Sequence, residues 1–180
     1  MKRRKLYALM LAVFMVLSLV GNAVPARAAT TIGLAVNPHT PEEIRAFIKA
    51  HPAPELANTY TSKPSTTAPY APGELSETSK TLAFNSLNQM RYIAGLPADV
   101  TEKEEYTEMT QAASLVNAVN RSLSHTPTKP ADMEDALYQL GYSGASSSNI
   151  AMTSWEGSIV YSVFMWMEDS DSYNIDRLGH

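Results

Sequence analysis

The sequence predicts a mainly α-helical protein with very little β-structure. Apolar residues recur at helical spacing, as in Ala83, Leu87, Met90 and Ala94, which would form one stripe on an α-helix. Segments with the alternating pattern of a strand are nearly missing, and Ile150 to Thr153 is very short. These two observations favour packed helices over a large sheet.

The first 28 residues have the three parts of a secretory signal peptide. Lys2 to Lys5 are basic, Leu6 to Val20 is apolar, and Ala26-Arg27-Ala28 places small residues at the positions that a signal peptidase reads. The apolar run is shorter than the ~20 residues that span a bilayer. We therefore expect cleavage before Ala29 and a secreted, extracellular protein with no membrane span after cleavage. The alternative is an uncleaved N-terminal anchor.

The charged residues of the chain indicate which classes of partner it can bind. Removal of residues 1–28 would leave nine basic and 18 acidic side chains, a net charge of −9 over 152 residues, because five of the 14 Lys and Arg residues lie there. Such a surface repels phosphate backbones and anionic lipid, so no nucleic-acid partner is expected. The chain has no cysteine, and its stability must come from a packed core.

Residues 29–75 are predicted to be a short helix followed by a linker. Thr40 and Glu43 form a capping box around Pro41, which predicts a helix from Pro41 to Ala50. Residues 51–75 have five prolines among Ser, Thr and Tyr. We therefore expect an extended, poorly ordered linker that leads to a compact domain over residues 76–180.

Four more helices are expected in residues 76–180. The first helix carries the stripe that begins at Ala83, and this helix is expected to end at Gly95. The second opens at a capping box, Thr101 to Glu104. Its predicted buried face consists of Ala112, Leu115, Val116, Val119 and Leu123.

The third of these helices is predicted to be short, from Met133 to Leu140, with Gly141 as its end. Gly144 to Ser148 is rich in Gly, Ala and Ser, which predicts a loop. The last helix, about Gly157 to Asp169, is apolar over most of its circumference. Such a helix must be covered on more than one side.

Four segments in order resemble the CAP superfamily, also called SCP, which includes cysteine-rich secretory proteins, pathogenesis-related plant proteins and a secreted bacterial branch. They are Leu87 to Leu96, Ser124 to Pro127, Ser148 to Ala151 and Arg177 to His180. The resemblance covers about residues 80–180. It implies an α/β fold, a three-layer α-β-α sandwich, of which the residues present are mainly helical and the C-terminal strands are missing. Residues 76–180 would then be a partial CAP domain, truncated at its C-terminus.

The resemblance also implies a concave site with two histidines and two acidic residues, which bind a divalent metal in some members. His125 and His180 match the histidines, and Asp169, with Glu168 beside it, matches the second acidic residue. Ser148 stands at the first acidic position, before the matching Asn149, and a hydroxyl is a poor ligand for zinc. His125, His180 and Asp169 are therefore the candidate ligands of a divalent metal such as zinc.

His125 and Asp169 also have readings without the family. His125 follows the predicted second helix by about half a turn and precedes Pro127, so it would lie at a helix C-terminus, where the last carbonyls accept its N–H. It would then be a capping or surface histidine. Asp169 would be a solvated helix end. His39 and His51 are interpreted as ordinary solvent-exposed residues.

We expect a secreted CAP-domain protein that binds an extracellular ligand in a His-containing cleft without being an enzyme. The ligand, cell-envelope material or a host or neighbour molecule, is not identified by the sequence, and neither is the oligomeric state. One alternative is a metal-dependent extracellular hydrolase, peptidase-like, that uses the histidine pair. Another is a helical interaction module unrelated to the family.

Overall fold

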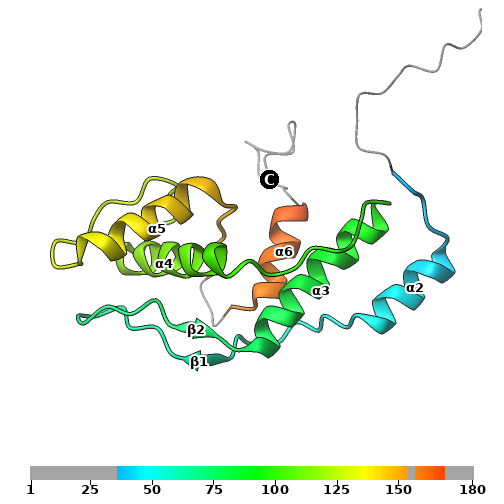
Figure 1. The fold of residues 1–180 in the computed structure, drawn as a ribbon, viewed down its shortest axis with the longest axis horizontal. Helices are drawn as coiled ribbons and strands as arrows, with labels where there is room; N and C mark the ends of the chain where they lie inside the picture. Colours follow the sequence, from blue (N-terminus) through cyan, green and yellow to red (C-terminus); the bar gives the residue numbers. More distant parts are fainter. Residues whose placement is uncertain (1–35, 154–156, 169–180) are drawn as a thin grey trace, which may run out of the picture. The chain divides into compact units, whose positions relative to one another are not determined.

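The computed structural model describes residues 36–153 and 157–168, which form one compact unit. Five helices and one two-stranded antiparallel sheet make up the regular structure of these residues (Figure 1). In chain order they are α2 (Pro41–Ala50), β1 (Tyr60–Ser62), β2 (Glu74–Leu75), α3 (Glu77–Ile93), α4 (Glu104–Asn120), α5 (Asp135–Ser147) and α6 (Ile159–Glu168). The mainly helical prediction is confirmed for the described residues, which show no three-layer sandwich. The predicted signal peptide, residues 1–28, lies outside them.

Helix α2 has the bounds that its capping box predicts. The Glu43 backbone N–H donates to Thr40 Oγ1 at 3.3 Å, and the Thr40 backbone N–H donates to Glu43 Oε2 at 2.8 Å. The Thr40 backbone N–H, followed by the Thr40 hydroxyl, holds the pKa of the Glu43 carboxyl below its usual value. The start of α2 is therefore specified entirely by local sequence.

The segment predicted as an extended linker instead contains a β-hairpin. Tyr60 pairs with Leu75 in the antiparallel register, and an isolated bridge joins Ser65 to Ala71 nearer the turn. The Tyr70 side chain leaves the hairpin and packs against the buried cluster of α4. Composition suggested a linker because proline and serine are common in both linkers and turns, whereas the contact of Tyr70 is a tertiary one.

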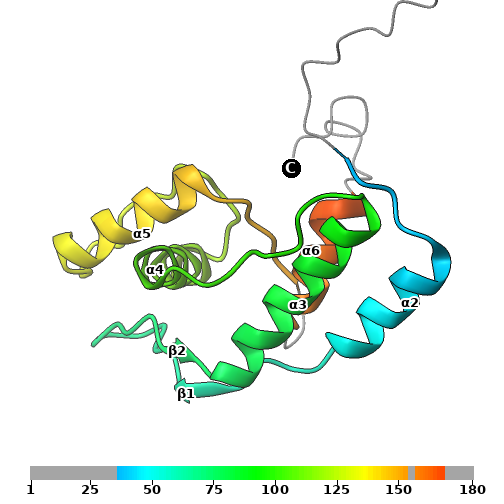
Figure 2. The ribbon, with the colours of Figure 1, turned by 45° about the vertical axis from the view of Figure 1, so that its right-hand side comes forward.

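Helix α3 packs against α2 and against α6 (Figure 2). Its buried positions are Ser79, Ser86 and Gln89. The apolar stripe that predicted this helix is half-buried at Ala83, Leu87 and Met90 and exposed at Ala94. Two of these polar side chains have partners, since Ser79 bonds to Thr59 and Gln89 to the His51 carbonyl, whereas the buried Ser86 hydroxyl has none among the described residues.

The core lies between α4 and α5. Leu115, Val116 and Met133 form its buried cluster, and Tyr70, Val119, Leu137 and Tyr138 pack against it. The prediction for the face of α4 is confirmed at Ala112, Leu115 and Val116, but Leu123 is 43% exposed because the helix has already ended. The predicted capping box at Thr101 is also wrong, since Lys103 is the N-cap and makes no side-chain cap bond.

Helix α5 continues through Gly141 and Gly144, where the sequence predicted an end and a loop. Both glycines are buried against α4, and a Cβ on Gly141 would lie 2.7 Å from Val116 Cγ2 and 2.8 Å from the Ala112 carbonyl oxygen. These glycines let two helix backbones approach closely. Glycine alone is an ambiguous signal, because it also ends helices.

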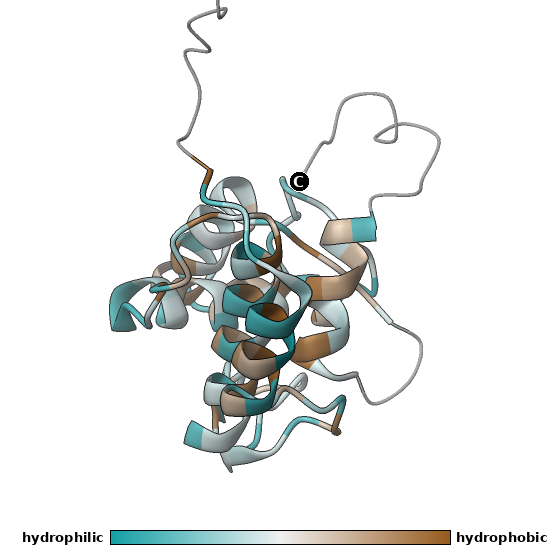
Figure 3. Cartoon of the chain, turned by 90° about the vertical axis from the view of Figure 1, so that its right-hand side faces the viewer, coloured by the Kyte–Doolittle hydropathy of each residue, from teal (hydrophilic) through white to brown (hydrophobic). Residues whose placement is uncertain are grey.

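Helix α6 is only partly covered. Val160 and Val163 are buried, while Phe164 is 41% and Met167 55% exposed. Hydrophilic and hydrophobic residues alternate along helical ribbons in Figure 3, the pattern expected of helices with one buried face. None of the helices within 36–153 and 157–168 has the length and hydropathy needed to cross a membrane.

Candidate functional site

His125 lies in the loop that joins α4 to α5. Helix α4 ends at Asn120 because Arg121 adopts a left-handed backbone conformation with φ of 51°. The predicted position of His125, about half a turn past the end of this helix, is therefore wrong. The chain has already turned back along α4 before it reaches His125, which is an exposed residue.

The start of this loop is fastened to the last turns of α4. The Ser122 backbone N–H donates to the Asn117 carbonyl at 3.3 Å, and the Ser124 backbone N–H donates to Asn117 Oδ1 at 2.7 Å. Ser124 Oγ in turn accepts the Thr126 backbone N–H at 3.0 Å. These bonds fix the backbone on both sides of His125.

The His125 ring contacts the last turn of α5. Its Nδ1 lies 2.6 Å from the Ala145 carbonyl oxygen. A carbonyl oxygen can only accept a hydrogen bond, so Nδ1 carries the proton and the neutral ring keeps its lone pair on Nε2. His125 thus caps a helix C-terminus, as its reading without the family predicted, but the helix is α5 rather than α4.

Ser148 lies at the same end of α5, as its C-cap residue. Its hydroxyl donates to the Gly144 carbonyl at 2.7 Å, so Ser148 and His125 bond to successive carbonyls of one helix turn. The structure therefore brings together these two of the predicted site residues. The hydroxyl proton of Ser148 is committed to the helix, and Asn149 follows as an exposed residue.

Among the described residues, Glu168 does not contact this pair. Glu168 is the exposed last residue of α6, while Asp169 and His180 lie outside the described residues. Within the described part of the chain, no three His, Cys, Asp or Glu side chains are arranged to hold a metal ion. Of the predicted zinc ligands, His125 alone lies among the described residues.

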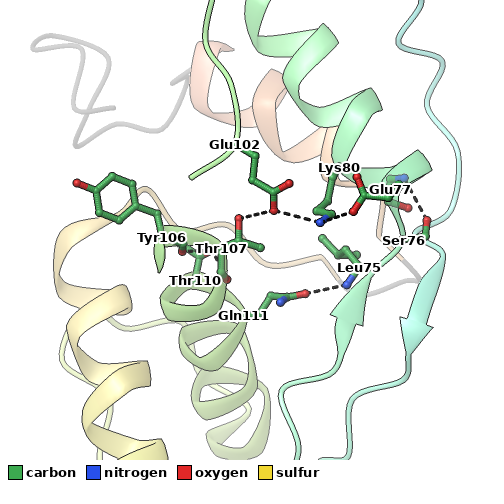
Figure 4. Close-up of polar contacts among 10 residues, drawn as sticks. Leu75, Ser76, Glu77, Lys80, Glu102, Tyr106, Thr107, Thr110 and Gln111 are labelled. Carbon is green, nitrogen blue, oxygen red and sulfur yellow. Dashed lines mark hydrogen bonds and ion pairs between the residues drawn. The ribbon is translucent and has the colours of Figure 1, made fainter. Parts of the chain in front are cut away.

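A polar network that the sequence did not reveal lies between α3 and the start of α4 (Figure 4). The Lys80 ammonium pairs with Glu77 at 2.5 Å and with Glu102 at 3.1 Å, and Glu102 also accepts the Thr107 hydroxyl at 2.9 Å. Glu77, then Glu102, raises the pKa of Lys80. Each carboxylate already has a partner, so the network joins two helices rather than offering a reactive group.

Four aromatic rings form a second unpredicted cluster, called here the ring column. Tyr92 of α3 lies face to face with His39 at 3.7 Å and with Phe47 at 4.1 Å, and Phe47 stacks on His51 at 4.1 Å. The interpretation of His39 and His51 as ordinary surface residues is therefore incomplete. The sequence offered one signal for this cluster, which is that His39 and His51 flank the helix Pro41–Ala50. The ring that completes the cluster, Tyr92, belongs to another helix.

No protein-family model, no curated protein and no solved structure matches this chain.

Proposed function

We propose that the chain is a secreted CAP-domain protein that binds an extracellular ligand through the surface around His125 and is not an enzyme. The bond between His125 Nδ1 and the Ala145 carbonyl is the observation that supports this best. It holds an exposed imidazole in one orientation at the end of α5. A fixed ring loses little freedom when a ligand binds, which favours recognition.

Binding is favoured over catalysis by what surrounds the ring. Ser148 replaces the first acidic residue of the family pattern, and its proton is donated to the Gly144 carbonyl. Among the described residues, the bond at Nδ1 goes to a carbonyl, with no carboxylate in contact with His125. A histidine base in hydrolases commonly has a carboxylate that stabilises its protonated form, and the described residues place none beside His125.

The three-layer sandwich is part of this proposal. Helices α3, α4, α5 and α6 would be helical elements of that fold. The exposed side chains of Phe164 and Met167 on α6 would then be covered by the sheet that the family places there. Exposed apolar side chains on a partly buried helix support a further layer over this face.

A metal-dependent hydrolase is the second candidate. Histidines that bind metals commonly donate their other ring N–H to a backbone carbonyl, as His125 does. This candidate needs Asp169 and His180 as further ligands. A zinc titration by calorimetry tests it: a heat signal lost in His125→Ala would support the metal site, and an isotherm that the substitution leaves unchanged would exclude it.

Co-sedimentation with purified bacterial peptidoglycan tests the first candidate. We expect the full chain to sediment with the polymer, and His125→Ala to bind about tenfold more weakly, which corresponds to about 1.4 kcal/mol. We also expect no release of soluble fragments, because the function is binding. Fragment release that depends on His125 would favour the hydrolase. Equal sedimentation of both proteins would leave the helical interaction module as the better reading.

A further inference from the structure

Asn117 is a buried polar residue of α4 whose side chain is bonded at both ends. Its Nδ2 donates to the Ala113 carbonyl at 3.1 Å, and its Oδ1 accepts the Ser124 backbone N–H at 2.7 Å. The first bond decides which way the amide faces, because only the nitrogen can donate to a carbonyl. The oxygen is consequently directed at the loop that carries His125.

We propose that Asn117 is a positioning residue that holds His125 in its Nδ1–H form, so that this surface offers Nε2 as a hydrogen-bond acceptor. The contacts run from Asn117 to Ser124, the residue before His125, and from His125 to Ala145. In this neutral form, Nε2 accepts a hydrogen bond from an N–H or O–H group, and its lone pair repels a carboxylate or phosphate oxygen. The ligand of the His125 surface is thus a molecule that presents an N–H or O–H group.

The position of Asn117 along the loop makes it the anchor for this ring. The later part of the loop is held by other residues, since Asn120 donates to the Thr128 carbonyl and Tyr138 to the Pro127 carbonyl. Both of those contacts lie after His125. Apart from the bond of the Arg121 backbone N–H to the Ala118 carbonyl at the end of α4, the bonds that reach the loop from α4 before His125 end on Asn117.

The tautomer of His125 can be read directly by ¹⁵N NMR of the full chain at about pH 8, above the range in which histidine usually becomes charged. His125→Gln assigns the signal. We expect the wild type to have Nδ1–H as the major form, and Asn117→Ala to lose it in favour of Nε2–H while remaining folded. Asn117→Asp keeps an acceptor for the Ser124 N–H and is expected to retain the Nδ1–H form.

A folded Asn117→Ala that retains the Nδ1–H form would overturn the proposal, as would a wild type with Nε2–H. If Asn117→Ala does not fold, Ser124→Pro removes the same bond from the donor side. Its matched control is Ser124→Ala, which keeps the backbone N–H and should keep the wild-type tautomer. Ser124→Pro with the wild-type tautomer would contradict the role of Asn117.

The inference depends on the proposed function only for the statement that a ligand binds at His125. The tautomer is measured without any ligand, so it can fail while peptidoglycan binding is observed. Conversely, the tautomer change can be found in a chain that does not bind peptidoglycan, and the proposed function alone would then fail.

Discussion

The Tyr70 hydroxyl donates a hydrogen bond to Asp132 Oδ1 at 2.7 Å, and this bond joins the β1–β2 hairpin to the loop between α4 and α5. The two residues are distant in the sequence, and Tyr70 also packs against the buried cluster around Val116. A hairpin of such short strands is marginal alone. Its attachment at Tyr70 explains why a segment with the composition of a linker is folded.

Removal of this bond should loosen the hairpin. The bond to Asp132 is the first cause that raises the pKa of Tyr70, followed by burial. Because the folded pKa is raised, the stabilisation is complete below the ordinary tyrosine pKa of about 10 and is lost as pH rises through the folded value. We expect Tyr70→Phe to lower the melting temperature at neutral pH, with a smaller deficit at strongly alkaline pH.

Spectrophotometric titration of tyrosinate checks this assignment. The variant should lack the component that ionises above the usual tyrosine range. Asp132→Asn is the matched control, because it keeps an acceptor while it removes the charge, and it should lower the pKa of Tyr70. A Tyr70→Phe protein with unchanged melting temperature at every pH would contradict the tie between the hairpin and the loop.

The start of α2 should respond to acid through Glu43. The pKa of this carboxyl is lowered in the folded chain, chiefly by the Thr40 backbone N–H. Its stabilisation is therefore present above the ordinary value of 4.5 and is lost as pH falls through the folded value. We expect hydrogen exchange at the first amides of α2 to accelerate over that interval, after correction for the intrinsic effect of pH.

Glu43→Gln is the matched control for this effect. Glutamine can occupy the same place in a capping box without a charge. Exchange at the start of α2 should then depend little on acid. If wild type and variant lose protection in parallel as pH falls, the carboxylate is not responsible.

The close approach of α4 and α5 should make Gly141 intolerant of a methyl group. An added Cβ would contact Val116 Cγ2 and the Ala112 carbonyl, so Gly141→Ala must push the helices apart. We expect a loss of about 1–3 kcal/mol in the free energy of unfolding. The neighbouring exposed position, Ser143→Ala, should change it by less than about 0.5 kcal/mol. Denaturant titration compares the two variants, and an unchanged stability of Gly141→Ala would contradict the close contact between α4 and α5 at this residue.

Replacement of Arg121 by glycine should stabilise the folded chain. It ends α4 with φ of 51°, a conformation in which a side chain is strained and glycine is not. We expect Arg121→Gly to raise the free energy of unfolding by about 0.5–1 kcal/mol. Arg121→Ala retains the Cβ and should give no such gain. Equal stability of the two variants would show that backbone strain at this residue is unimportant.

What the sequence predicted correctly is local in origin. The bounds of α2 follow from Thr40 and Glu43, which are three residues apart and bond to each other. The buried residues Ala112, Leu115 and Val116 follow from helical spacing alone. Such signals are complete within one or two turns of chain, so no tertiary information is needed.

What the sequence missed depends on contacts between distant segments. In the sequence of α5 alone, Gly141 predicts the end of a helix. With α4 packed beside it, the same glycine allows the two helix backbones to approach closely. For the site, the position of His125 before Pro127 predicted a capping or surface histidine at the end of a helix. The identity of the capped helix required the three-dimensional path of the loop, which turns back at Arg121.

The ring column has a consequence for how the chain opens. Helix α2 contains no buried residue, and it is held on α3 by the rings of Phe47 and Tyr92 and by the bond from Gln89 to the His51 carbonyl. Elements with so few buried contacts unfold locally at a lower free energy than the core. Residues from His39 to His51 therefore form a small cooperative unit that can detach and return while the α4–α5 core stays folded, and a single free energy of unfolding will not describe both.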